Sequence, residues 1–441
     1  MSLVTRGIGL AKAAKRRGQA YWKQRTPVYL SPVRRIERVR LPERICAMTF
    51  DDGPSRLPAN PGGDRPLTLL LAETLESFHA RGTFDVVGDT SGNYPDQAGK
   101  HGSASWGGRH FDHYPDFGRD EDGGAAHCPE LIQRLLDGGH EITSHTYAHI
   151  LWGRKALVYG QRTSLGSLDK VTEDLQRLHT LLKDRYDYTI RLGRPPHYVD
   201  RIQPPLNSYD AYALMGYQYL AASFDGAGWL PLSSYEAEVE ATWRPLEQAL
   251  GQHPDALAGQ IIFQKDGCNM ARRTPIAHGL PRQLELLQQA GYQVVTVSSL
   301  LEKSPFADLG PGDAGFDATR RLLERGLCPA YRDNTVRLQQ PVTRGELVML
   351  FHGWKGAPLR ISQILNRQKP IFSDLPVAHP YAGAAAVAAE RGALQTGASF
   401  QSDTPADAAL LDGLLESAGA TPAGRIPESR RGLLELLAER L

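Results

Sequence analysis

Two adjacent acids end an apolar run near the start of the chain. In ICAMTFDDGPS, residues 45–55, Asp51 and Asp52 follow a β-branched, apolar stretch that predicts a buried strand. Gly53 and Pro54 come next. Neighbouring carboxylates repel, and burying them costs free energy unless a cation or hydrogen bonds compensate. The pair therefore predicts either a surface turn, which Asp, Gly and Pro favour, or a metal site with a base beside it.

Two histidines can supply the remaining ligands of such a site. His145 and His149 stand four residues apart in HEITSHTYAHI, after a second expected strand. If the chain turns helical there, both imidazoles lie on one face and can share a cation. Two histidines and one carboxylate, with an open fourth position, form the ligand set of hydrolytic zinc sites. One acid can then bind the metal while the other stays free as a base.

Both acids can enter one pocket only if the strand breaks, because neighbouring side chains of a regular strand face opposite ways. Gly53 and Pro54 allow such a break. Further along, Arg194 opens RPPHY and Asp225 opens DGAGW, each after another expected strand. A charge-assisted pair with Arg194 would keep the pKa of the free aspartate low enough for it to act near neutrality. The alternatives are a surface arginine and Trp229 as ordinary core.

Strand and helix patterns alternate from about residue 41 to 303. The seven runs that predict strands are ICAMTF, GTFDVVG, HEITS, YTIRL, YQYLAAS, GQIIFQ and YQVVTV. Helical spacing with Pro or Gly at the ends predicts helices between them, as in 67–82 and 129–139. The alternation indicates a parallel α/β barrel or a doubly wound sheet, in which function collects at the carboxyl ends of the strands.

The chain changes character after Ser304. Residues 306–324 and 372–390 each combine Phe-x-Asp-Leu, an Ala- or Leu-rich helix and a closing Glu at the same interval, and Arg-Gly follows each of them. Equal spacing without gaps indicates an internal helical repeat. Gly326 and Gly392 stand where each helix needs a left-handed terminator.

Composition and charge bound the remaining choices. At 441 residues the chain is long enough for two or three domains, and no apolar run approaches the roughly 18 residues that span a bilayer. Residues 1–44 hold twelve Lys or Arg against two acids, without the apolar core of a signal peptide. We interpret this start as a solvated extension, with a helix resting on an anionic surface as the alternative. The four scattered cysteines indicate neither a zinc knuckle nor a disulfide scaffold.

One long segment has no periodicity. Residues 89–127 are rich in Gly, Asp and His. Such a segment inside a domain predicts a solvated loop that borders the active site. A second metal site at His110, Asp112 and His113 is the alternative.

The ordered motifs TFDDGP, HTYAH, RPPHY and DGAGW, with the closing LPRQLELLQQAGYQVVTVSSLLE, resemble the polysaccharide deacetylase family. This is the NodB-homology type, carbohydrate esterase family four. The resemblance covers about 41–303 and implies a distorted parallel (β/α) barrel of about seven strands, followed here by a small all-α repeat domain. It also implies a metal-dependent hydrolase that removes N-linked acetyl groups from an amino-sugar polysaccharide and releases acetate.

The resemblance also implies roles for single residues. Asp51 would be the catalytic base, Arg194 would orient it, and Asp225 would brace Arg194. The divalent metal would be zinc, with cobalt, manganese and nickel as alternatives, and its ligands would be Asp52, His145 and His149. The residues on the substrate side would be Pro195, Tyr198 through its backbone N–H at the oxyanion, and Trp229 at the acetyl pocket.

The chain departs from the family at several positions. In IIFQKDG, Lys265 replaces the histidine that serves in the family as general acid on the leaving amine. Loss of a general acid typically lowers the rate by about 10²–10⁴. Lys265 can donate the proton if burial lowers its pKa, with His278 or a loop histidine as substitutes. Gly228 replaces a second family acid, and Asp85 stands where an aromatic residue is usual. The alternative function is a non-catalytic or weakly catalytic cell-envelope glycan-binding protein that retains the metal site.

The C-terminal repeats resemble S-layer homology modules, with Thr343-Arg344-Gly345-Glu346 at the signature position. The resemblance implies anchoring to an anionic cell-wall glycan, with Arg344 as a principal contact. The second copy carries Thr-Pro-Ala-Asp at 404–407 and lacks the arginine, and a third copy survives only as ESRRGLLELLAERL. A purely structural role is the alternative, because helical repeats persist as scaffolds.

These patterns divide the chain into three parts. They are a basic extension at 1–40, a catalytic domain at 41–303 and helical repeats at 304–441. The expected partner is an N-acetylated polysaccharide, with no nucleic acid, since the basic start lacks interleaved aromatic residues. We expect no transmembrane segment. The domain content indicates a cell-envelope or secreted location, although no leader is visible.

Overall fold

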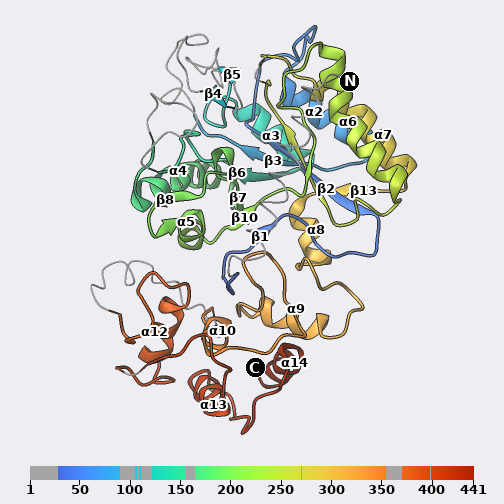
Figure 1. Cartoon of the computed structure of the whole chain (residues 1–441). Helices are drawn as coiled ribbons and strands as arrows, with labels where there is room; N and C mark the ends of the chain where they lie inside the picture. The colour runs from blue at the N-terminus through green and yellow to red at the C-terminus, as the bar shows by residue number, and fades with distance from the viewer. Residues whose placement is uncertain are drawn as a thin grey trace, which may run out of the picture.

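A parallel β-sheet with its helices and a group of C-terminal helices make up the computed structural model of the chain (Figure 1). The residues that it describes are 28–89, 105–106, 109–110, 122–153, 164–269, 271–353, 370–397 and 399–441. The basic segment 1–27 lies outside them. So do Asp112, His113 and the side chain of His110, the residues of the alternative second metal site.

The main sheet curls into a half-barrel, and all of its strands run parallel. Its strands, in spatial order, are β1 (Arg35–Ile36), β10 (Gln218–Leu220), β7 (Leu192–Gly193), β6 (Glu141–Ser144), β3 (Thr83–Val86), β2 (Ile45–Asp51), β12 (Ile261–Lys265) and β11 (Phe224–Asp225). A further strand, β13 (Gln293–Val295), pairs with the first half of β2. Because Ala47 pairs with both β12 and β13, β13 lies on the β3 side of β2. Two small hairpins, β4–β5 (Ser105–Trp106 and Arg109–His110) and β8–β9 (Arg201–Gln203 and Leu206–Asn207), lie outside this sheet.

The predicted parallel α/β architecture is confirmed, and each of the seven predicted runs contributes to this sheet. The run YTIRL contributes only Leu192, at the start of β7. Sequence reasoning missed β1 and β11, because two-residue strands are too short to show an alternating pattern. Among the described strands no pairing joins β1 to β11, so the barrel is open.

Helices follow most of the strands and pack on the sheet (Figure 1). They are α2 (Leu67–Ser77), α3 (Pro129–Asp137), α4 (Leu168–Tyr186), α5 (Ser208–Met215), α6 (Tyr235–Gln252), α7 (Ile276–Gln289) and α8 (Val297–Lys303), with a 3₁₀ turn, η2 (Pro196–Tyr198). Leu71 and Leu75 of α2 are fully buried, as their spacing predicts, in the same core cluster as the stacked rings of Phe50 and Phe84. Full burial of each such side chain contributes roughly 1.5–3 kcal/mol, so this layer fixes the strands that carry the site.

The buried histidine just before β6, His140, is expected to make the stability of the fold depend on pH. The Nδ1 atom of His140 accepts the Gly82 N–H at 3.0 Å, and the ring lies edge-on to Phe84. Burial lowers the pKa of His140 to about 4, against the raising effect of Glu76. Since the unfolded chain then binds the proton more readily, stability falls as the pH drops from 6.5 toward 4.

We therefore expect His140 to remove about 2 kcal/mol of stability between pH 7 and pH 5. The variant His140→Asn, whose Oδ1 atom takes the place of Nδ1 and can accept the same N–H, should lose this part of the pH dependence. Urea unfolding of both proteins at the two pH values measures it. Equal losses of stability in the variant and the wild type would show that His140 does not carry the effect.

The C-terminal helices enclose a second apolar core. They are α9 (Phe316–Glu324), α10 (Arg344–Leu350), α12 (Ala382–Glu390), α13 (Ala408–Ser417) and α14 (Arg430–Arg440). Helices are present at both repeated segments, and Gly326 and Gly392 have the predicted left-handed backbone, with φ of 86° and 79°. Their identity as S-layer homology modules stays a prediction.

The segment 28–40 joins the two cores. Leu30 belongs to the C-terminal core and bridges to Tyr331, whereas β1 extends the sheet. Between them the Arg34 guanidinium donates to the Pro305 carbonyl at 2.7 Å and to the Asn334 side chain at 2.9 Å. The described end of the predicted solvated extension is therefore packed, and the sheet begins before residue 41.

Among the described helices, none combines the length and the apolar character that a membrane crossing requires.

Candidate metal centre and active site

Strand register brings the predicted site residues to one edge of the sheet. Asp51, at the end of β2, is in register with Lys265 on one side and with Asp85 on the other. Asp85 is in turn in register with Thr143 on β6, and the strand β6 leads into His145. Because these strands are parallel, their carboxyl ends meet at the same edge, as the sequence predicts for a functional site.

The two acids share one pocket because the strand breaks at the second of them. β2 ends at Asp51, and Asp52 has a φ of 82°, in the left-handed region that few residues other than glycine adopt. This turn brings both carboxylates into the same pocket, where their residues are 4% and 6% exposed. The predicted break is confirmed, although it lies at Asp52 itself and not at the following Gly53.

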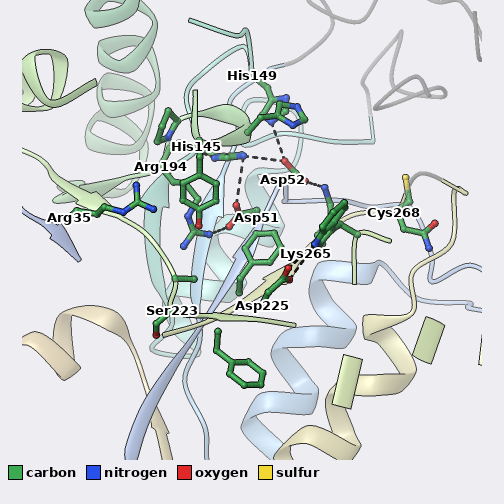
Figure 2. A pocket seen from close by; sticks show the side chains of 18 residues that line it. Arg35, Asp51, Asp52, His145, His149, Arg194, Ser223, Asp225, Lys265 and Cys268 are labelled. Carbon is green, nitrogen blue, oxygen red and sulfur yellow. Dashed lines mark hydrogen bonds and ion pairs between the residues drawn. The ribbon is translucent and has the colours of Figure 1, made fainter. Parts of the chain in front are cut away.

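Three side chains converge as a candidate metal centre. The Asp52 Oδ1 atom lies 3.3 Å from His145 Nε2 and 3.2 Å from His149 Nε2. Figure 2 shows these three side chains pointing toward one another at the top of the pocket. All three are buried, and each offers one ligand atom within 4.8 Å of the others.

The chain does not turn helical at the two histidines, the condition under which spacing alone would place both imidazoles on one face. After β6 the chain forms a turn, in which Thr146 and His149 have φ of 74° and 51°. The buried Asp174 of α4 holds this turn, because its carboxylate accepts the N–H groups of Tyr147 and Ala148 at 2.9 and 3.1 Å. Sequence reasoning missed Asp174, since a lone acid within a helical pattern looks like a solvent-facing residue.

The donor chemistry fits a divalent metal. The Nδ1 atom of His145 lies 3.0 Å from the Arg194 carbonyl oxygen, an acceptor that favours a proton on Nδ1. The Nε2 atom of that tautomer carries a lone pair directed at the Asp52 side, as a metal ligand requires. Two imidazoles and one carboxylate suit zinc, and zinc sites with three protein ligands leave a fourth position open.

Asp51 lies outside the group of Asp52, His145 and His149 and is held by an arginine, although it also forms a second group of possible ligands with Asp85 and His145. Its Oδ1 pairs with Arg194, which is fully buried and also donates to the Thr49 hydroxyl at 3.1 Å. Burial raises the pKa of Asp51 to about 7, although Arg194 and His145 both lower it. Arg194 thus lowers this pKa, as the sequence predicts, but burial raises it by more.

The predicted contact between Asp225 and Arg194 is not made in the described part of the chain. Asp225 lies exposed at the end of β11, where it accepts the Trp229 indole N–H at 3.2 Å and the Ala227 N–H at 2.8 Å. These local partners hold its carboxylate at the rim of the pocket. A different acid, Asp85, lies beside Arg194, with 3.7 Å between its Oδ2 and the arginine Nε.

The predicted oxyanion donor also has another partner. The Tyr198 N–H donates to the Pro195 carbonyl at 3.0 Å within η2, where Tyr198 has a φ of 56°. Pro195 and Tyr198 nevertheless line the pocket, as does Trp229. The pocket also holds His197, which sequence reasoning left without a role and whose ring lies 5.6 Å from that of His149.

Lys265 faces the candidate metal centre. Its Nζ atom forms an ion pair with Asp52 Oδ2, the oxygen that does not face the histidines, and its side chain is 7% exposed. The expected substitute His278 lies on α7, with its Nδ1 atom 2.6 Å from the Tyr235 hydroxyl. It is not among the described residues that line the pocket, so Lys265 is the better placed of the two.

The pocket around these residues is large enough for a sugar unit. Its volume is about 400 Å³, within the range of small-molecule sites. Its apolar walls include Phe224, Phe263 and Trp229, whereas Arg35 lies at one side (Figure 2). Aromatic walls around a few fixed polar groups are typical of ligand sites.

Arg344, the predicted glycan contact, has partners within the protein. It pairs with Asp407, donates from Nε to the Phe400 carbonyl at 3.0 Å, and its side chain is 23% exposed. Thr343 caps α10, and Glu346 completes the capping box. Arg344 therefore joins α10 to the start of α13, and its glycan-anchoring role stays a prediction.

The comparisons with known proteins agree with the motifs in one part of the chain. Residues 38–219 match the family model described as Polysaccharide deacetylase. The predicted resemblance to this family is confirmed for that part. The match ends before Asp225, Trp229 and Lys265, so their roles rest on the motifs. No curated protein matches the chain.

Several solved structures are similar at low identity. The chitin deacetylase of the fungal pathogen Colletotrichum lindemuthianum is 18% identical, with 64% of this chain and 95% of that chain covered and a TM-score of 0.41. The peptidoglycan deacetylase PdaC of Bacillus subtilis is 19% identical, with 60% and 93% covered and a TM-score of 0.38. A CE4 family pseudoenzyme of Bacillus anthracis is 12% identical, with 62% and 70% covered and a TM-score of 0.40. Likeness at this level does not indicate what this chain does.

Proposed function

We propose that this protein is a metal-dependent hydrolase that removes N-linked acetyl groups from an amino-sugar polysaccharide and releases acetate. The observation that carries the proposal is the separation of the acid pair. Asp52 joins His145 and His149 in one ligand set, whereas Asp51 stays beside it, held by Arg194. The match of residues 38–219 to polysaccharide deacetylases supports the same reaction class.

The residues divide the chemistry among them. Asp52, His145 and His149 would hold a divalent metal, most simply zinc, which supplies Lewis acidity toward a water and the acetamide carbonyl. Asp51 takes a proton from the attacking water, and a bond forms between that oxygen and the carbonyl carbon. Lys265 gives a proton to the nitrogen as the carbon–nitrogen bond breaks. The products are acetate and a free amine on the sugar.

The proposed partners follow from the two parts of the chain. An N-acetylated polysaccharide of the cell envelope would enter the pocket beside Trp229. The C-terminal helices would hold a cell-wall glycan, with Arg344 near the contact. This proposal includes a cell-envelope or secreted location, and its support is the resemblance of the repeats to S-layer homology modules.

Acetate release decides the proposal. The purified protein, stripped of metal with a chelator and reloaded with zinc or cobalt, is tested on chitin oligosaccharides, peptidoglycan and other N-acetylated glycans. We expect release from at least one substrate, loss of release with the chelator and recovery with the metal. Unchanged release in the chelator would remove the metal from the mechanism.

One observation favours the alternative of a glycan-binding protein. Lys265 pairs with the metal-ligand acid at the position where the family carries its histidine acid. A protein that keeps this ion pair can bind metal and glycan without turning over. Glycan binding without acetate release, across substrates and metals, would support this alternative and contradict the hydrolase.

Substitution of Lys265 tests its role as proton donor. We expect Lys265→Met to lower kcat by about 10²–10⁴, the usual contribution of a general acid, with little change in KM. Lys265→His, which retains a donor, should recover part of the rate. Initial-rate measurements of acetate release compare the three proteins. A Met variant with the kcat of the wild type would show that another group protonates the amine.

A further inference from the structure

A third buried acid lies behind the metal centre and has no role in the mechanism above. Asp85 lies on β3, in register with Asp51 on β2, and its side chain is fully buried. Its Oδ1 atom accepts the Thr143 hydroxyl at 2.7 Å. This contact from the neighbouring strand β6 fixes the plane of the carboxylate.

The second oxygen of Asp85 lies between two residues of the site. Asp85 Oδ2 is 3.5 Å from His145 Nδ1 and 3.7 Å from Arg194 Nε. It has no hydrogen bond among the described residues. A buried carboxylate oxygen that is incompletely hydrogen-bonded lowers the stability of a fold, so stability does not explain its presence.

Arg194 is thus held from two sides by acids. Its Nη1 pairs with Asp51 in the pocket. Its Nε donates to the Leu220 carbonyl at 3.4 Å and lies 3.7 Å from Asp85 Oδ2 behind the pocket. A planar guanidinium that two carboxylates contact at different nitrogens has little freedom to rotate. Asp225, which the sequence analysis assigned to this place, lies at the rim and holds Trp229.

His145 is held in a similar way. Its Nε2 atom faces Asp52, and its Nδ1 atom faces the Arg194 carbonyl and the Asp85 carboxylate. A carboxylate on the far side of a metal-binding histidine orients the ring and makes the metal-facing nitrogen a better ligand. One carboxylate therefore contacts both the residue that holds the base and a residue of the ligand set.

We propose that Asp85 is a positioning residue that holds Arg194 and His145 together and so fixes the base Asp51 relative to the metal centre. The part that concerns Asp51 rests on the proposed function. The part that concerns His145 needs only metal binding. The two parts can therefore be tested separately.

The experiment compares Asp85→Asn with a matched control. Glu141→Gln also neutralises a buried carboxylate, at the opposite end of the neighbouring strand β6, where Glu141 accepts from Thr83 and Ser298. Zinc affinity is measured by competition with a chromogenic chelator, and kcat and KM by acetate release. We expect Asp85→Asn to weaken zinc binding by about 10–100-fold and to lower kcat more than it changes KM. The control should keep both values within about twofold of the wild type.

A second variant guards against misfolding. Thr143→Val leaves the charge of Asp85 in place but removes its hydroxyl donor, so we expect a smaller loss of zinc affinity in the same direction. Thr143→Ser should restore it. The proposal is overturned if Asp85→Asn binds zinc as tightly as the wild type. It is also overturned if the folded wild type has no measurable zinc affinity. A wild type that binds zinc but releases no acetate contradicts the proposed function alone, and the zinc comparison still decides the role of Asp85.

Discussion

Asp52→Ala is expected to abolish metal binding and acetate release together. Asp52 supplies the only oxygen of the candidate ligand set, and its Oδ1 lies 3.2–3.3 Å from both histidine nitrogens. Two imidazoles alone leave a weak site, so metal affinity should fall by more than the ~10–100-fold typical of outer-shell partners. Acetate release should fall to the level of the chelated wild type. Zinc competition and acetate assays on the same samples measure both effects.

The controls separate metal loss from unfolding. Removing Asp52 leaves the buried Lys265 ammonium without its partner, which typically costs about 3–5 kcal/mol. Asp52→Asn keeps the shape of the side chain, and Asp64→Ala replaces an exposed acid in the loop before α2. Both should fold, as circular dichroism can check, and only Asp64→Ala should keep metal and activity. Full metal affinity in folded Asp52→Ala would exclude Asp52 as a ligand.

The second large effect is expected at Asp51. Asp51→Asn should lower kcat by about 10²–10⁴, the usual contribution of a general base. Its zinc affinity should stay within a few-fold of the wild type, because Asp51 lies beside the ligand set: its Oδ2 is 3.9 Å from His145 Nε2. Initial rates and zinc competition measure the two quantities separately.

The substitutions of the two neighbouring acids should have different effects on metal binding. Asp51 and Asp52 are adjacent and equally buried, yet only one of the two substitutions should release the metal. Loss of zinc affinity in Asp51→Asn would show that both acids are ligands. An unchanged kcat in that variant would place the base elsewhere in the pocket.

Much of the fold could be read from local pattern. Alternating apolar strands and amphipathic helices predict a parallel sheet, because each pattern buries one face of its own element. The same patterns locate Asp51, Asp52 and His145 just after strands, and parallel strands end at the same edge. The short strands β1 and β11 could not be found in this way, because two residues carry no periodicity.

The partners of the site residues could not be read in the same way. Asp225 was expected to face Arg194, but Asp225 accepts from Trp229, four residues ahead. A helix would bring the two histidines onto one face, but a non-helical turn held by Asp174 of α4 carries them. In both places a hydrogen bond decided the geometry, and hydrogen bonds leave no periodic trace in the sequence.

The amino-acid sequence thus determined which residue types end each strand, and with them the candidate ligand set and the class of chemistry that we propose. Only the tertiary structure decided which buried acid stands behind Arg194, since Asp85 meets Arg194 and His145 through the register of three strands. It also decided that Lys265 pairs with Asp52. The physical reason is that the periodicity of a sequence depends only on which face of a single helix or strand is buried. The pairing of charges depends on the distances between elements that lie far apart in the chain.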